Sequence, residues 1–181
     1  AIGPTVEEFG LAISDNLKIR RLKNQIKNLE KAKKIAEENN INVKQINLKA
    51  LFPYLEGAAL EEDENLQDMW ANLFVNYIDS DRNLTMTVFP DILKHLSSNE
   101  VNMLNFMNSN HGRIKKSRWN NETKDYPLEY TLEEMGNLAR LGLIRDESNF
   151  SMYDGDKIEE LMPENYYLTE LGEALLKACK R

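Results

Sequence analysis

The chain has 181 residues, of which 41% are hydrophobic, and a formal net charge of −7 with an isoelectric point near 5.0. This composition allows a sizeable core and excludes a generally disordered chain. Because the overall charge is negative, binding to nucleic acid or to an anionic membrane would need a local basic patch. No apolar run approaches the roughly 18 residues that span a bilayer, and no signal peptide is visible. The single cysteine, Cys179, excludes an intrachain disulfide and fits a reducing compartment.

The first predicted element is one long helix over residues 5–39, a stretch that no proline interrupts. Within it, Ile19, Leu22, Ile26 and Leu29 follow a 3–4–3 spacing and form a narrow apolar seam over about two heptads. A coiled coil needs about three or four such heptads. We therefore expect the seam to lay this helix on the rest of the fold.

Two shorter helices are predicted next. A polar connector over 41–47 leads to a helix that Pro53 is expected to open, since proline is tolerated in a first turn. A further helix is expected to begin at Asp63 or Glu64, with its apolar positions recurring every three or four residues. We expect Trp70 of that helix to be buried, with its indole N–H bonded to a carbonyl or an acid.

The C-terminal part of the chain predicts a winged-helix-like module. Ser97 with Glu100, and Thr131 with Glu134, are capping-box signatures that each begin a helix. The elements expected after them are a strand over 143–145, a hairpin at Asp154-Gly155, a returning strand over 166–168 and a last helix capped by Thr169. The predicted fold class is therefore mainly α. A helical domain over 1–96 is followed by a winged-helix-like α+β domain over 97–181 with a small β-wing.

Several segments carry a family resemblance. The stretch from Tyr54 to Phe74, with its acidic run before a tryptophan, resembles the central motif of the Abi-alpha family, a bacterial family associated with abortive infection. The segment 20–24 and the ending over 141–179 resemble it as well. The resemblance implies a role in bacterial defence against phage, and it brings no catalytic residues with it. The single cysteine and the lack of a visible signal peptide favour a cytoplasmic location. The sequence begins at Ala1, so a peripheral membrane location would depend on residues upstream.

Three charged segments are candidate interaction sites. The basic run 18–34 could bind an anionic partner or pair internally with the acids of 56–68, and its first members are Lys18, Arg20, Arg21 and Lys23. The acidic cluster could cap a helix, bind a basic partner or hold a metal, and it includes Glu61, Glu62 and Asp63. The third segment combines bases with an aromatic ring, as phosphate-and-stacking surfaces do, and contains Arg113, Lys115, Lys116, Arg118 and Trp119.

The usual DNA-binding face of a winged helix is acidic in this sequence. The wing region 145–167 holds seven acids and two bases, which would repel phosphate. The leading hypothesis is therefore a non-enzymatic binding or effector component of antiphage defence that contacts an unknown protein partner. The alternatives are a nucleic-acid-associated effector using 18–34 and 113–119, and a membrane-surface toxin. No cofactor, metal or catalytic residue is predicted, and the chain could form a homo-oligomer. An enzymatic activity also stays open, because convergent catalytic sites leave no local signature in a sequence.

Overall fold

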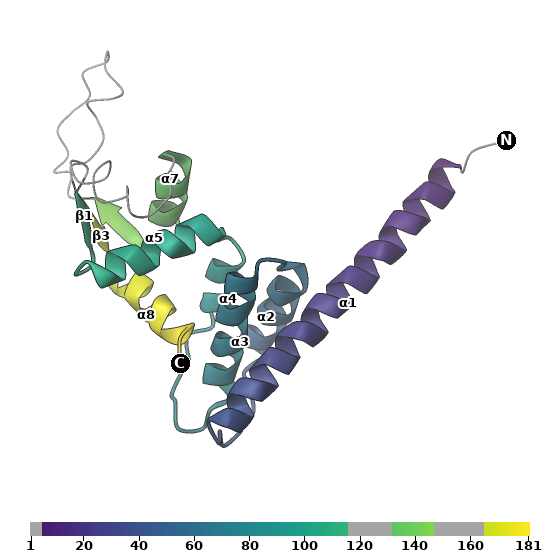
Figure 1. The fold of residues 1–181 in the computed structure, drawn as a ribbon, viewed down its shortest axis with the longest axis horizontal. Coiled ribbons are helices and arrows are strands. Elements are labelled where there is room, and N and C mark those ends of the chain that lie inside the picture. The colour runs from purple at the N-terminus through teal and green to yellow at the C-terminus, as the bar shows by residue number, and fades with distance from the viewer. Residues whose placement is uncertain (1–4, 116–131, 147–164) are drawn as a thin grey trace, which may run out of the picture. The chain divides into compact units, whose positions relative to one another are not determined.

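The computed structural model describes residues 5–115, 132–146 and 165–181 (Figure 1). The described chain is mostly helical with one small antiparallel sheet, which confirms the predicted fold class at that level. It divides into two compact units. Unit 1 comprises residues 1–95 and 178–181, and unit 2 comprises residues 96–177.

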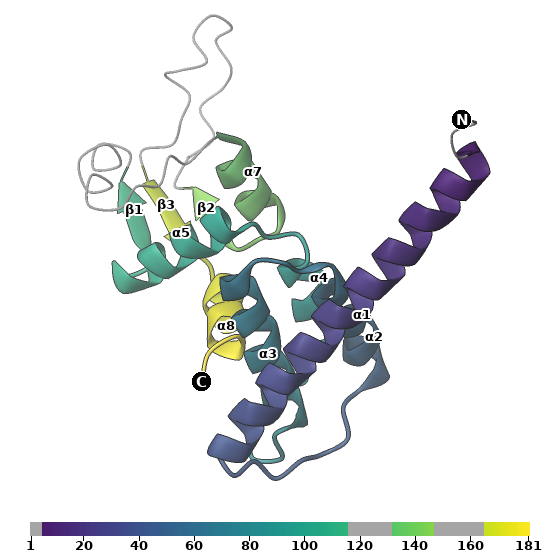
Figure 2. The ribbon, with the colours of Figure 1, turned by 45° about the vertical axis from the view of Figure 1, so that its right-hand side comes forward.

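Unit 1 is built on one long helix, α1 (Val6–Glu38), with α2 (Leu48–Leu60) and α3 (Glu64–Ile78) packed against it. The 33 residues of α1 form a continuous helix within one residue of the predicted bounds. Its C-terminal half lies along α2 and α3, whereas its N-terminal half extends beyond them (Figures 1 and 2).

The face of α1 that packs against α2 and α3 is partly polar. The side chain of Asn28 is fully buried, donates to the carbonyl of Gln67 at 2.8 Å and accepts a hydrogen bond from the hydroxyl of Tyr54. Asn24 and Gln25 donate to backbone carbonyls of α2 at 3.2 and 2.9 Å. Since buried polar groups must keep their partners, these bonds fix the rotation of α1 about its axis.

The apolar seam of α1 does not pack on the fold, so that prediction is wrong. Ile19, Leu22, Ile26 and Leu29 are between 39% and 57% exposed. A helix advances about 100° per residue, so Ile26 points almost directly away from the buried Asn28. The asparagine bonds, together with the small buried residue Ala32, orient the seam to solvent.

The helix α2 begins at Leu48, five residues before Pro53, and not at the proline as predicted. The reason is Asn47, whose side chain accepts a hydrogen bond from the N–H of Lys49 at 2.9 Å and so caps the helix. Pro53 lies inside the helix.

The start of α3 is as predicted, because the carboxylate of Asp63 accepts hydrogen bonds from Asn65 and Leu66 at its N-terminus. Trp70 is fully buried, as expected, with its ring 5.7 Å from that of Tyr54. No described residue accepts a hydrogen bond from its indole N–H, so the predicted pairing is wrong. The short helix α4 (Phe89–Leu93), with proline in its first turn, completes the helices of unit 1 that the structure describes.

Unit 2 contains a helix with a complete capping box, α5 (Ser98–Ser109), in which the Ser97 and Glu100 side chains bond each other's backbone as predicted. Its sheet has the order β1-β3-β2 and is antiparallel throughout. The remaining elements are β1 (Arg113–Lys115), α7 (Leu132–Arg140), β2 (Ile144–Asp146), β3 (Asn165–Leu168) and α8 (Glu170–Ala178). The predicted hairpin at Asp154-Gly155 lies outside the described residues, so the winged-helix assignment stays a prediction.

The start of α8 is bonded to the connection between α7 and β2. The hydroxyl of Thr169 donates to the carbonyl of Gly142 at 2.6 Å and accepts from the N–H of Gly172 at 3.1 Å. A Cβ atom on Gly172 would lie 2.4 Å from the carbonyl oxygen of Leu143. Glycine is therefore the residue that allows this close approach.

Candidate interaction surfaces

The basic run of α1 is paired in part with the acidic cluster of the same unit. The guanidinium of Arg20 forms a two-pronged ion pair with Glu62, at 2.7 Å from Nε and 3.0 Å from Nη2. About three turns further along α1, Lys31 lies 2.6 Å from both Glu64 and Asp68. Arg20 and Glu62, which belong to two different candidate sites in the sequence analysis, thus form an ion pair in the structure.

These ion pairs shift the titration of their members. Hydrogen bonds from Lys27 and Lys31 hold the pKa of Glu64 at about 2, well below its usual range. Burial alone would lower the pKa of Lys31, but its hydrogen bonds to Asp68 and Glu64 outweigh that effect and raise it. A free anionic ligand would have to displace these carboxylates, so the second half of the basic run is a poor phosphate site.

The other candidates at this end of unit 1 have local roles or face solvent. The carboxylate of Glu61 accepts from the backbone N–H groups of Glu62 and Asp63, both at 2.9 Å. Asp63 in turn caps α3. Lys18 is exposed and lies 3.2 Å from Asp15 on the same helix. Arg21 and Lys23 are exposed positions of α1.

The basic and aromatic segment 113–119 is described only at its start. The guanidinium of Arg113 donates to the side-chain oxygen of Asn165 at 3.0 and 3.3 Å and stands 5.5 Å from the ring centre of Tyr167. The backbone of Lys115 pairs with Asn165 in the sheet. The other members of this candidate site, Lys116, Arg118 and Trp119, lie outside the described residues.

In α7 the side chains of Glu134, Asn137 and Arg140 are bonded within unit 2. The amide of Asn137 donates to the buried carboxylate of Glu100 at 2.6 Å and accepts from the guanidinium of Arg140 at 2.6 Å. The side chain of Glu134 accepts from Asn99 at 3.2 Å. These bonds hold in place side chains that a helix in a DNA groove would need free for base edges.

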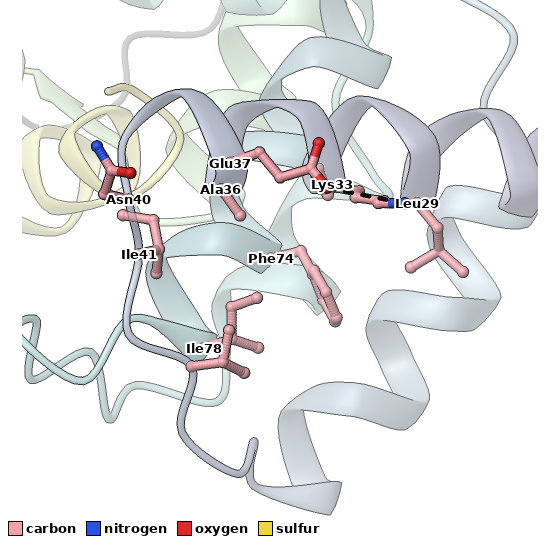
Figure 3. A pocket seen from close by; sticks show the side chains of 10 residues that line it. Leu29, Lys33, Ala36, Glu37, Asn40, Ile41, Phe74 and Ile78 are labelled. Carbon is pink, nitrogen blue, oxygen red and sulfur yellow. Dashed lines mark ion pairs between the residues drawn. The ribbon is translucent and has the colours of Figure 1, made fainter.

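An exposed apolar line on unit 1 is formed by Ile19, Leu22, Ile26 and Leu29, and we call it the α1 stripe. At its C-terminal end Leu29 borders a groove of about 540 Å³. Figure 3 shows Leu29, Phe74, Ile41 and Ile78 around this groove, with the Lys33–Glu37 ion pair on the α1 side. The stripe and the groove together present a continuous, mostly apolar surface.

The sequence predicts that the residues of the α1 stripe share one face of the helix, but it does not predict that this face is exposed. Leu29 and its neighbours on the seam were recognised by their spacing, which is the same for a helix packed on its own domain and for one that binds elsewhere. Ile41 and Ile78 were not singled out, because a groove forms from segments that only the fold brings together.

No group of three or more histidine, cysteine, aspartate or glutamate residues in the described part of the chain is arranged to hold a metal ion. None of the described helices combines the length and the apolar character that crossing a membrane would require. Cys179 is buried, as its place beside Leu175 predicts.

The described part of the chain is thus mostly helical and forms two compact units. Its sequence matches the family described as abortive infection alpha over residues 15–179, so the chain belongs to that family. Membership implies a part in abortive-infection defence against phage. No curated protein and no solved structure matches the chain.

Proposed function

We propose that this chain is a non-enzymatic binding component of abortive-infection defence, and that it acts in the bacterial cytoplasm through protein contacts made by α1. The observation that carries the proposal is the α1 stripe: four large aliphatic side chains in line, all at least 39% exposed. Contiguous exposed apolar surface of this kind marks interaction sites on soluble proteins.

The α1 stripe stays exposed within unit 1, because α1 cannot rotate about its axis to bury it. The buried bonds of Asn28, at 2.8 Å to Gln67 and to the hydroxyl of Tyr54, would break if α1 rotated. Leaving such groups without partners inside the unit costs about 1–3 kcal/mol each. Covering the stripe therefore requires a surface from outside unit 1.

The nucleic-acid alternative has less support. Arg20 and Lys31, which stand in the basic run, are held by the carboxylates of Glu62, Glu64 and Asp68. Arg113, at the start of the second basic segment, is bonded to Asn165 and lies against Tyr167. A protein contact uses the apolar side chains that are exposed and leaves these pairs intact.

The experiment is a phage plating assay in cells that carry the wild-type gene or a stripe variant, Leu22→Glu/Ile26→Glu. We expect wild type to reduce plating efficiency and the variant to lose that protection, because two carboxylates at the centre of the stripe prevent its burial. A matched control is Lys34→Glu, which changes an exposed position on another face of the same helix. Full protection by a stripe variant that keeps wild-type helicity and melting temperature would overturn the proposal.

A further inference from the structure

The α1 stripe belongs to a longer pattern whose residue spacing is the same when counted from either end. Along one line of the helix stand Asp15, Ile19, Leu22, Ile26, Leu29 and Lys33. Their successive spacings are 4, 3, 4, 3 and 4 residues. An acid closes the line at its N-terminal end and a base closes it at the C-terminal end. Such a pattern is self-complementary when two copies of the helix run in opposite directions.

We propose that a second copy of this chain covers the α1 stripe, with the two α1 helices antiparallel about a two-fold axis. This inference rests on the proposed function and names its partner. In the register we infer, Leu22 of one copy packs beside Ile26 of the other, and Ile19 packs beside Leu29. Each layer then joins an isoleucine to a leucine, which is the pairing of unlike core positions that antiparallel helix pairs make.

Charge decides the direction of the pair. In the antiparallel register Asp15 of each copy lies beside Lys33 of the other. A parallel pair would set Asp15 beside Asp15 and Lys33 beside Lys33, and like charges in contact disfavour that arrangement. Within one copy, Asp15 and Lys33 have exposed neighbours at 3.2 and 3.7 Å, Lys18 and Glu37. Exposed pairs of this kind are weak, so both side chains can turn to the second copy.

The same register gives the groove an occupant. It carries the N-terminal turns of one α1 past residues 33–40 of the other. Within that range the groove is lined by Lys33, Ala36, Glu37 and Asn40 (Figure 3). Those turns extend beyond α2 and α3 and carry exposed apolar side chains, among them Leu11. The contact is thereby longer than the two heptads of the stripe alone.

Packing of each unit 1 leaves room for the second helix. The stripe points away from Asn28, and Asn28 faces α2 and α3. In the antiparallel pair, the α2 and α3 helices of each copy therefore lie on the outer side of its own α1.

The test is a charge exchange followed by sedimentation velocity over a range of protein concentrations. Wild type is expected to form a dimer. Asp15→Lys and Lys33→Asp should each weaken it by about tenfold or more, because each creates two like-charge contacts. The double variant Asp15→Lys/Lys33→Asp should restore the dimer to within about threefold of wild type. Lys34→Asp is the control, since Lys34 is 76% exposed against 75% for Lys33 and has the same kind of neighbour four residues on.

A monomer at every concentration, or a double variant as weak as the single ones, would overturn the self-pairing. The plating assay separates this from the proposed function. If the chain is monomeric but Leu22→Glu/Ile26→Glu still loses protection, the stripe binds another protein, so the proposed function stands and self-pairing fails. Circular dichroism of each variant establishes that α1 is still helical.

Discussion

The side chain of Trp70 fills the space that a Cβ atom on Gly57 would occupy: that atom would lie 2.3 Å from Cη2 and 2.5 Å from Cζ2 of the indole. Gly57→Ala should therefore lower the free energy of unfolding by about 2 kcal/mol, because overpacking a tight core costs more than the roughly 1 kcal/mol that alanine gains as a helix former. Denaturation in urea measures the change.

The matched control for this substitution is Gly10→Ala in α1, where a Cβ atom meets nothing within 4 Å. It should leave stability unchanged or raise it by up to about 1 kcal/mol, since only helix propensity acts. Equal gains for both glycine variants would show that α2 and α3 do not approach as closely as the structure has them.

The ion pairs between α1 and α3 predict a pH dependence of stability. Lys27 and Lys31 hold the pKa of Glu64 at about 2 in the folded chain, against about 4.3 in an unfolded one. A lowered pKa stabilises the fold above the unfolded value, and that contribution is lost as pH falls from about 4.3 through about 2. Glu64→Gln should thus lower the melting temperature at pH 7 and leave it nearly unchanged near pH 2.

The control for the pH series is the background Lys27→Ala/Lys31→Ala, in which Glu64 has lost both bases. There Glu64→Gln should have little effect on the melting temperature at pH 7. If it has the same effect in both backgrounds, the ion pairs are not the cause.

Arg181 links the end of the sequence to the C-terminal end of α3. Its guanidinium donates to the carboxylate of Asp79 at 2.5 Å, and the two side chains are 14% and 4% exposed. The N–H of Asp81, and then Arg181, hold the pKa of Asp79 below its usual range. Arg181→Ala should lower the free energy of unfolding by about 2 kcal/mol, because it removes a charged hydrogen bond from a buried carboxylate.

Lys180→Ala is the comparison for this prediction, since Lys180 is exposed and contributes its backbone carbonyl, which accepts from Asn76 at 3.2 Å. Denaturation curves should place it close to wild type. Equal stability of the Arg181 and Lys180 variants would mean that the contact with Asp79 does not hold unit 1 together.

Local signals in the sequence were sufficient to place several helix ends. Asp63 begins α3, and Ser97 with Glu100 begins α5, because each cap bonds to backbone within three residues. The start of α2 was predicted wrongly at Pro53. The helix begins earlier than its proline, because Asn47 caps it.

The interior of unit 1 was harder to predict, because its contacts join residues far apart in the chain. Asn28 and Gln67 are polar, and spacing alone assigns them to a solvent face, yet both are buried, and the side chain of Asn28 bonds the backbone of Gln67, 39 residues further along the chain. The seam at Ile19 and Leu22 was found by its spacing and wrongly laid on the fold. Periodicity states which residues share a face, and only the fold states what that face meets.

The most direct measurement of whether another α1 covers the stripe is disulfide formation in the purified chain. In the antiparallel register residue 22 faces residue 26 of the other copy, so oxidation of Leu22→Cys/Ile26→Cys should give a dimer band on a non-reducing gel. Leu22→Cys alone should give little, and the native Cys179 is buried and should stay unreactive. Failure of the double variant to cross-link, or equal cross-linking by the single one, would contradict the antiparallel pair.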